Sequence, residues 1–171
     1  MGAKQGLENV VEAARLAGEC DANVQFMLIG DGGERRALED AARGVSHISF
    51  VDPLNDDDYR LALAAADVLI VNEKPGVANM AVPSKLTSYF AAARPVVAAT
   101  DAGGITASEI DSAGAGRVVA AGDPRALLEA IQNLGSDKDA AAHFGLNGQR
   151  YRETVLDQQT AIQAWAGLIS G

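Results

Sequence analysis

Three segments of the sequence contain residue types that can hold a phosphate group. The first is a Gly-Asp-Gly-Gly run in which Gly32 and Gly33 permit a tight turn and a close approach of the backbone to a ligand. The second is a long segment at 72–86 that ends in Pro-Ser-Lys-Leu, and the third contains Gly103 and Gly104. Where such a segment opens a helix, the exposed N–H groups attract phosphate, and a nearby lysine adds positive charge. Together the three segments predict an anion-binding surface.

Each segment also has a simpler interpretation. The glycines of the first segment can merely close a turn, and they do not complete a dinucleotide fingerprint because Arg35 stands at the third glycine position. Lys85, in the second segment, can be a solvated lysine beside a capped helix. No Ser-His-Asp or Cys-His arrangement accompanies these segments, and the acidic residues are too scattered to nominate an acid–base pair. The sequence therefore predicts binding more clearly than catalysis, and it assigns no catalytic residue.

The composition excludes several other classes of function. A formal net charge of −9 argues against non-specific nucleic-acid binding, which depends on clustered cations. His47, His143 and the single cysteine, Cys20, lack the spacing of metal ligands, so no metal site is expected. One cysteine allows no internal disulfide, and no apolar run reaches the ~20 residues that span a bilayer. A cytoplasmic location is the resulting expectation.

Short apolar runs alternate with segments of helical period, as in βαβ units around a parallel sheet. We expect strands at 24–30, 47–51, 67–71, 95–100 and 116–121. We expect helices near 6–19, 34–43, 57–66, 84–93, 106–113, 124–134 and 138–171. Asn55 and Asp123 are typical residues for a helix start. The last helix is expected to break around Gly145 and Gly148, because glycine lowers helix propensity.

These elements predict an α/β fold with a doubly wound, parallel, Rossmann-like sheet, in one domain that spans 1–171. In such sheets ligands bind beyond the carboxyl ends of the strands, so the three segments above are expected to share one edge. The first strong element is nevertheless the helix near 6–19, whereas a domain of this kind usually opens with a strand. We therefore expect that the chain is cut from a longer one just after its first strand.

Several segments, taken in order, resemble the C-terminal domain of group 1 glycosyltransferases, which are retaining enzymes of the two-domain GT-B architecture. They are KQGLENVVEAA, GDGGERRALE, HISFVDPL, ADVLIV, PSKLTSYFAAARPVVAA, DAGG and GDPRALLEAI. The chain is most similar to the bacterial branch that carries PSKL before the helix and that typically makes surface polysaccharides or exopolysaccharides. The resemblance covers nearly the whole chain.

The resemblance implies a function for the chain. Members of the family transfer a sugar from a nucleotide-sugar donor to a saccharide or lipid-linked acceptor, usually without a metal. Their C-terminal domain binds the donor, which is a substrate, so no cofactor is expected. The implied partners are the donor and an N-terminal acceptor domain that 1–171 lacks. Any peripheral association with a membrane is expected to involve that missing domain alone.

The resemblance also implies site residues. Lys4 matches a basic residue that contacts the donor diphosphate, and Ser84 with Lys85 would complete this clamp as charge develops on the leaving group. Val51 and Asp52 match the place where the base is held. The expected donor- and phosphate-binding residues are Lys4, Gly32, Gly33, Val82, Ser84, Lys85, Ser88, Gly103 and Gly104.

The sequence departs from the family pattern in the second segment. The paired glutamates of the family would fall on Met80 and Ser88, and the usual glycine before the Pro-Val strand is Ala93. The contacts that those glutamates make to ribose and sugar cannot be transferred to this chain, so the identity of the donor stays open. Glu73 lies in the same segment and is expected to face solvent.

The missing glutamates keep two alternatives open. One is a non-catalytic nucleotide-binding or interaction module that has kept the fold and lost the chemistry. The other is half of a nucleotide-sugar epimerase or a phosphorylase.

The order of the strands in the sheet can also be predicted. A family order of 3-2-1-4-5-6 without its first strand predicts that the remaining five strands close up as 2-1-3-4-5, counted in this chain. If instead a gap persists between 24–30 and 67–71, a segment of another chain is expected to fill it.

Overall fold

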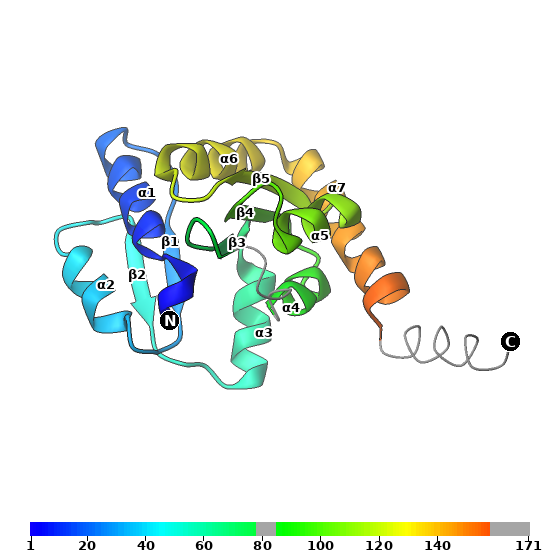
Figure 1. Cartoon of the computed structure of the whole chain (residues 1–171), viewed down its shortest axis with the longest axis horizontal. Helices are drawn as coiled ribbons and strands as arrows, with labels where there is room; N and C mark the ends of the chain where they lie inside the picture. The colour runs from blue at the N-terminus through cyan, green and yellow to red at the C-terminus, as the bar shows by residue number, and fades with distance from the viewer. Residues whose placement is uncertain (78–84, 158–171) are drawn as a thin grey trace, which may run out of the picture.

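The computed structural model of the chain describes residues 1–77 and 85–157 (Figure 1). The predicted positions Met80, Val82 and Ser84 therefore lie outside the described residues. Five strands lie within them, each inside or one residue beyond the predicted range: β1 (Phe26–Ile29), β2 (Ile48–Val51), β3 (Leu69–Asn72), β4 (Val96–Thr100) and β5 (Gly116–Ala120). The α/β class predicted from the sequence is confirmed.

Helices separate the strands, as the alternating pattern predicted. They are α1 (Glu8–Glu19), α2 (Arg35–Ala41), α3 (Asp56–Ala65), α4 (Lys85–Ala91), α5 (Ile105–Ala113), α6 (Pro124–Ser136) and α7 (Lys138–Tyr151). A 3-10 turn, η1 (Ala3–Gln5), precedes α1, and a π-helical turn, η2 (Arg152–Leu156), follows α7. The expected helix starts are confirmed, because the side chains of Asn55 and Asp123 each accept a hydrogen bond from a first-turn N–H at 2.9 Å.

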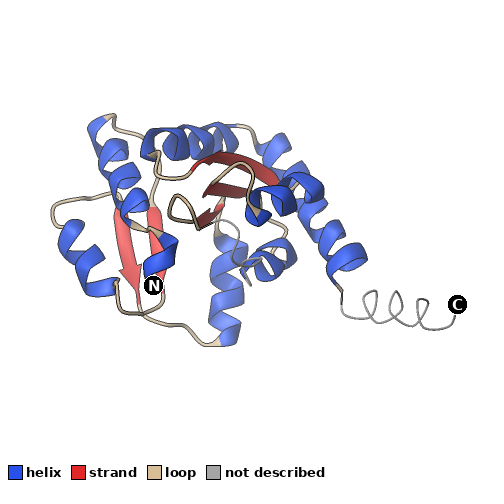
Figure 2. Ribbon diagram, viewed as in Figure 1, coloured by secondary structure: helices blue, strands red, loops and turns tan. Residues whose placement is uncertain are grey.

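The strands form two parallel sheets instead of one. β1 pairs with β2, and β3, β4 and β5 pair in that order. Figure 2 shows the two groups of strands apart from each other. The neighbours within each group agree with the predicted order 2-1-3-4-5, but the predicted pairing of β1 with β3 is not formed. The alternative expectation, a persistent gap between these two strands, describes the structure.

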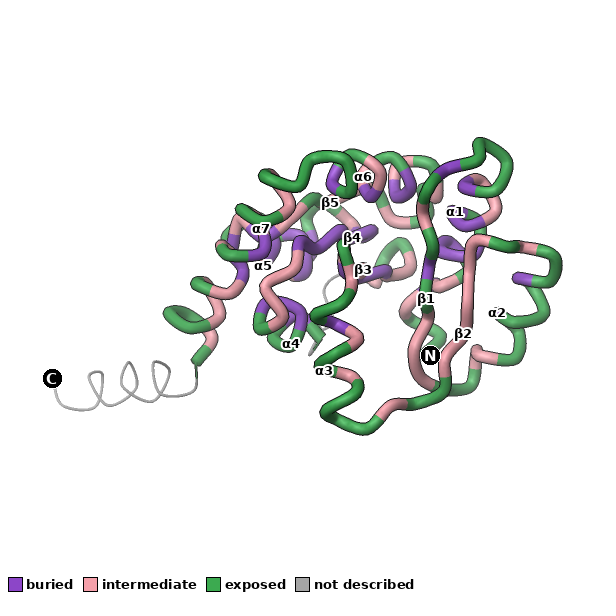
Figure 3. The backbone as a smooth tube through the Cα atoms, turned by 180° about the vertical axis from the view of Figure 1, so that it is seen from behind, coloured by how far each residue is buried: buried purple, intermediate pink, exposed green. Residues whose placement is uncertain are grey.

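The three-stranded sheet is covered on both faces, which makes it doubly wound. Along β4, Val97 and Ala99 pack with α1 and α6, whereas Val96 and Ala98 pack with α3, α4 and α5. All five residues of β4 are buried, while those of β2 are only half-buried, as the purple and pink tubes in Figure 3 show. The main core is therefore centred on β4, and the two-stranded sheet lies at its margin.

The predicted break in the last helix is wrong. α7 continues through both Gly145 and Gly148 to Tyr151. A Cβ atom added at Gly145 would lie 2.1 Å from the carbonyl oxygen of Ala93, and one at Gly148 would lie 2.9 Å from Cδ1 of Phe90. These glycines allow α7 to approach the end of α4 closely, so their cost in helix propensity is offset by tertiary packing.

Replacing Gly145 by alanine is expected to destabilise the fold. The added methyl group would overlap the backbone after α4, and overpacking of this kind costs about 1–3 kcal/mol. The matched control is Gly135→Ala in α6, where an added Cβ would meet no atom within 4 Å. The control is expected to be neutral or to stabilise by about 0.5–1 kcal/mol. Urea unfolding measures both variants, and equal midpoints would contradict the close packing of α7.

Candidate functional site

The segment that begins the chain is tied to the carboxyl end of β3 by a buried amide network. Asn72, the last residue of β3, donates to the carbonyl oxygens of Gln5 at 2.7 Å and Gly6 at 2.8 Å. Its Oδ1 accepts a hydrogen bond from Nδ2 of Asn9 at 2.8 Å. Next along the chain, the N–H of Lys74 donates to the carbonyl oxygen of Lys4 at 3.0 Å. The backbone of Lys4 is therefore fixed where β3 ends.

Gly6 is required at this junction for two reasons. Its φ of +58° lies in the left-handed region, and a Cβ atom there would lie 2.8 Å from Cγ of Lys74. Lys74 is itself a cation at this edge that sequence reasoning did not select. Its ammonium group lies 3.8 Å from the Glu8 carboxylate, and both side chains are exposed enough that this pair contributes little stability.

Glu73 was expected to face solvent, and this expectation is wrong. Its carboxylate accepts hydrogen bonds from the hydroxyls of Thr100 and Thr106, the latter at 2.7 Å, and both threonines are fully buried. Its backbone N–H donates to Ala99 at 2.9 Å. The hydroxyls are contributed by β4 and α5, elements that are remote in the sequence, so no local pattern could have identified them. Glu73 thus joins the end of β3 to the end of β4.

A second hydrogen bond joins the loops that follow β3 and β4. The N–H of Gly76 donates to a carboxylate oxygen of Asp101 at 2.8 Å. Asp101 also accepts, through its carbonyl oxygen, from the N–H of Gly104 at 2.9 Å. Gly104 caps α5 with an extended backbone and no side chain, while a Cβ atom at Gly103 would meet nothing within 4 Å. The start of α5 is therefore open on the side of the Gly103 backbone.

Arg35 organises the other half of this edge, where β1 and β2 end. Its guanidinium donates to the carbonyl oxygens of Gly30 at 2.8 Å and Val51 at 3.2 Å, and it pairs with Asp52 at 2.9 Å. A bond to Glu39, four residues on, raises the pKa of Arg35 above its ordinary value, and Asp52 acts in the same direction. Arg35 thus brings Val51 and Asp52 to the glycine turn. The spacing of four between Arg35 and Glu39, which favours an ion pair on a helix, was the sequence feature that could have drawn attention to Arg35.

Residue 1 links the two halves of the edge. A Cβ atom at Gly32 would lie 2.3 Å from the backbone nitrogen of Met1, and φ of Gly32 is +135°. The Met1 nitrogen donates to the carbonyl oxygen of Asp31. Gly33, by contrast, has open space around it. The structure therefore places Gly32 and the Lys4 segment together, at the ends of β1 and β3.

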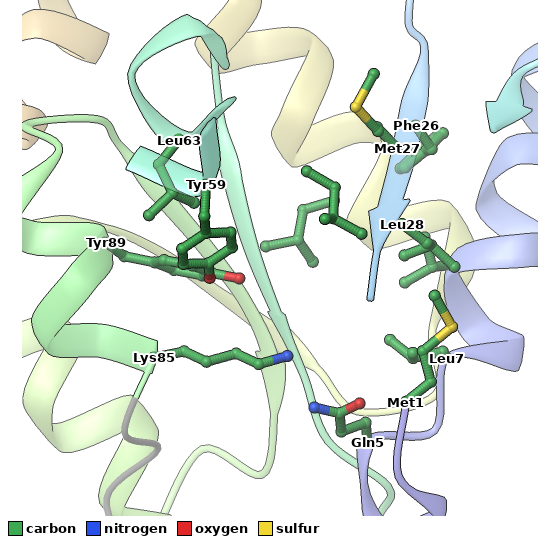
Figure 4. Close-up of a pocket in the computed structure, with 13 residues that line it drawn as sticks. Met1, Gln5, Leu7, Phe26, Met27, Leu28, Tyr59, Leu63, Lys85 and Tyr89 are labelled. Carbon is green, nitrogen blue, oxygen red and sulfur yellow. The ribbon is translucent and has the colours of Figure 1, made fainter. Parts of the chain in front are cut away.

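Lys85, the first residue of α4, extends into a pocket between β1 and β3 (Figure 4). Gln5 and Met1 line the same pocket, so Lys85 does reach the segment that carries Lys4. Partial removal of its ammonium group from water lowers the pKa of Lys85 below its ordinary value. A perturbed lysine in a pocket is a reasonable candidate for a functional role.

Ser88 lies elsewhere. It is exposed on α4 and lines a pocket over α3 and α4 together with Arg60 and Arg152. This pocket shares Tyr59 and Leu63 with the pocket of Lys85, but Ser88 does not line the latter. Among the candidates within 1–77 and 85–157, the structure thus brings Gly32 and Lys85 to the N-terminal segment that carries Lys4. It joins Val51 and Asp52 to the turn after β1 through Arg35. Gly103 lies at the neighbouring loop after β4.

Within the described residues, no group of three or more His, Cys, Asp or Glu side chains could hold a metal ion. In the same part of the chain, no helix has the length and apolar character that crossing a bilayer requires.

Comparison with known proteins gives one family. The family model described as glycosyl transferases group 1 matches residues 1–137. The chain is 31% identical over 139 residues to the probable glycosyltransferase WbjE of Pseudomonas aeruginosa, which covers 78% of this chain and 34% of that protein. It is 39% identical over 94 residues to the putative colanic acid biosynthesis glycosyl transferase WcaI of Escherichia coli K12, covering 53% and 22%. The chain thus spans about a third or less of these relatives.

Solved structures share the fold. The HepE protein of Anabaena, crystallised in complex with UDP, matches 99% of this chain and 46% of its own with a TM-score of 0.80 and 22% identity. The C-terminal domain of the group 1 glycosyl transferase LpcC of Francisella tularensis matches 93% of this chain and 83% of its own, with a TM-score of 0.75 and 18% identity.

Replacing Glu73 by alanine is expected to destabilise the protein by about 1–3 kcal/mol, because it leaves the buried hydroxyls of Thr100 and Thr106 without their acceptor. The control is Glu12→Ala, which removes an exposed pair with Arg15 at 3.4 Å and is expected to cost at most about 1 kcal/mol. Urea unfolding compares the two. A cost for Glu73→Ala no larger than that of the control would show that its carboxylate is solvated.

Proposed function

The chain belongs to the group 1 glycosyl transferases, and on that premise we propose that it binds a nucleotide-sugar donor for transfer of the sugar to a saccharide or lipid-linked acceptor. The donor site is the edge formed by the carboxyl ends of β1 to β4. The observation that carries this proposal is the tethering of the Lys4 segment to both halves of that edge, through Asn72 and through Met1.

Electrostatics support a site for the diphosphate here. In a chain of net charge −9, an anionic ligand needs cations close to where it binds. Lys4 and Lys74 lie at the end of β3, and Lys85 extends toward Gln5. The open start of α5 at Gly103 and Gly104 adds N–H groups and the positive end of a helix dipole. Ser84 and Val82 are proposed as further contacts on the strength of the family resemblance.

The nucleobase is proposed to bind where β1 and β2 end. The Val51 carbonyl oxygen already accepts from the N–H of Gly30 and from Arg35, which uses both of its lone pairs. Asp52 is exposed and shares only one carboxylate oxygen with Arg35. Base recognition is therefore assigned to Asp52 and to backbone groups next to it, with Gly32 and Gly33 allowing close approach. The binding of UDP by HepE is consistent with such a site.

Residues 1–171 are proposed to be one donor-binding domain of a larger, two-domain enzyme. The matched region spans 34% of each of two curated relatives, which leaves room in those proteins for a further domain. We propose that the acceptor binds such a second domain. From the same resemblance we propose retention of configuration, independence of metals and cofactors, a role in polysaccharide synthesis and membership of the branch that carries PSKL. A cytoplasmic location is proposed from the composition.

A second candidate is a binding module without catalysis. Met80 and Ser88 replace the paired glutamates of the family, and Ser88 does not line the pocket that contains Lys85. This observation favours a module that binds a nucleotide without turning it over. The epimerase alternative gains no support from the family match.

Neutralising Lys4 or Lys85 is expected to weaken nucleotide binding. Each loss of a charge-assisted hydrogen bond to phosphate costs about 1–3 kcal/mol. Calorimetric titration with UDP compares Lys4→Ala and Lys85→Ala with Lys138→Ala, an exposed lysine at the start of α7. The control is expected to bind UDP as the parent chain does. Unchanged affinity in both test variants would show that these lysines are ordinary solvated residues.

The isolated chain is expected to have no transferase activity. In the proposed enzyme the reaction takes place between two domains, and residues 1–171 supply only the donor side. Release of UDP from UDP-glucose, measured with and without saccharide acceptors, tests this expectation. Robust sugar transfer by residues 1–171 alone would refute the division of labour between two domains.

A further inference from the structure

A groove lies over α3 and α4, in the helical layer that covers one face of the three-stranded sheet (Figure 1). It contains about 640 Å³ of accessible space, within the roughly 300–1,000 Å³ that is typical of small-molecule sites. The polar side chains that line it are Asp56, Tyr59, Arg60, Thr87, Ser88 and Arg152. Guanidinium and hydroxyl groups dominate this set, so the groove has both the size and the polar partners that a ligand site requires.

Arg152 reaches the groove from η2, and packing fixes the position of that turn. The ring of the preceding residue, Tyr151, packs edge-on against Phe90 of α4 with the ring centroids 6.1 Å apart. Leu156, at the other end of η2, packs against the same apolar cluster. Nε of Arg152 is nevertheless buried without a hydrogen-bond partner in the described part of the chain. An unpaired buried donor is costly, so its presence calls for a partner that binds there.

Arg60 contributes a second guanidinium group, from α3. Its ion pair with Asp57 is long, at 3.8 Å, and the two side chains are 78% and 92% exposed. A pair of this kind contributes little and leaves the guanidinium group available to a ligand. Two arginines from separate elements therefore line one groove. The planar guanidinium fork binds the oxygens of a phosphate group in a bidentate manner, which makes phosphate the anion that best matches this pair.

The remaining polar groups suit the uncharged part of such a ligand. Thr87 and Ser88 are exposed on α4, and their hydroxyls can both donate and accept hydrogen bonds. The carboxylate of Asp56 accepts hydrogen bonds but repels phosphate, so it is expected to meet hydroxyl groups of the ligand. Ala91 and Ala92 also line the groove, and their small side chains leave room for it.

We infer that this groove is a second ligand site, which binds a phosphate ester of a saccharide or of another small polyol. Arg60 and Arg152 bind the phosphate group, and the hydroxyls of α4 bind the part that carries hydroxyl groups. The ligand is soluble and is not a membrane lipid, because the first turn of α3 carries three consecutive aspartates, 56–58, that would repel an anionic membrane surface.

This site is separate from the proposed donor site and does not depend on it. The groove shares Tyr59 and Leu63 with the pocket of Lys85, but Lys85 lines only the latter, whereas Arg60 and Arg152 line only the groove. A phosphate group held by the two arginines is therefore expected to bind at the same time as a nucleotide at the edge of the strands.

The inference is tested by NMR titration of residues 1–171 with glucose 6-phosphate, in the absence and presence of UDP. Glucose serves as the uncharged probe. The test variants are Arg60→Gln and Arg152→Gln, and the matched control is Arg125→Gln, an exposed arginine on α6 at the opposite face of the sheet. Thermal unfolding shows whether each variant is folded. Because Arg60 is exposed, its variant decides the test should Arg152→Gln fail to fold.

Glucose 6-phosphate is expected to shift the backbone amide signals of Thr87 and Ser88, with or without UDP, and glucose is expected to bind at least about tenfold more weakly. Each test variant is expected to weaken binding of glucose 6-phosphate by about tenfold or more, and the control is expected to leave it unchanged. These shifts are measured whether or not UDP binds, so failure of UDP to bind would contradict the proposed donor site alone.

Three results would overturn the inference. The first is absence of binding by the parent chain, or equal affinity in the parent chain and the test variants. The second is displacement of glucose 6-phosphate by UDP with shifts centred on Gly32 and Gly103, which would assign its binding to the donor edge. The third is co-sedimentation with phosphatidylglycerol vesicles that is lost in both test variants, which would assign the two arginines to a lipid phosphate.

Discussion

The buried side-chain amide of Asn72 holds together the parts of the molecule on which the candidate site depends. It uses both of its donor hydrogens on the carbonyl oxygens of Gln5 and Gly6 and its oxygen on Asn9. These partners are otherwise separated from β3 by more than 60 positions in the chain. A buried amide that lost them would carry a large desolvation cost, so the position of the N-terminal segment is coupled to the stability of β3.

The site shows how a strongly acidic chain distributes its few cations. Arg35 is used structurally, because its guanidinium holds the ends of β1 and β2 and pairs with Asp52. Lys85 is exposed as a residue, but partial removal of its ammonium group from water lowers its pKa below the ordinary value. The guanidinium of Arg35 thus fixes the ends of β1 and β2, whereas Lys85 forms no ion pair within the residues that the structure describes. A charge held in this way is suited to meet an anionic ligand.

The split sheet explains why the strands of the two sheets differ in how deeply they are buried. β4 has neighbours on both edges and helices on both faces, and each of its residues is buried. Within 1–77 and 85–157, β1 has a partner on one edge alone, and its residues after Phe26 are exposed or half-buried. Residues of α1 and α6 share one apolar cluster with Phe26 of β1 and Val97 of β4, so this cluster connects the two groups of strands.

The sequence alone determined the strands, most of the helices, their order and the parallel α/β class, and it predicted the edge at which a ligand is expected, because these follow from local periodicity, helix caps and the rules of parallel sheets. The resemblance also identified the family. The tertiary structure decided the roles of Glu73, Arg35 and Gly145, and it separated β1 from β3. Each of these features depends on partners far away in the chain, such as Thr106 for Glu73 and Ala93 for Gly145, or on whether two strands within the described residues pair. Local propensity contains no information about such contacts, which arise only when the chain is packed.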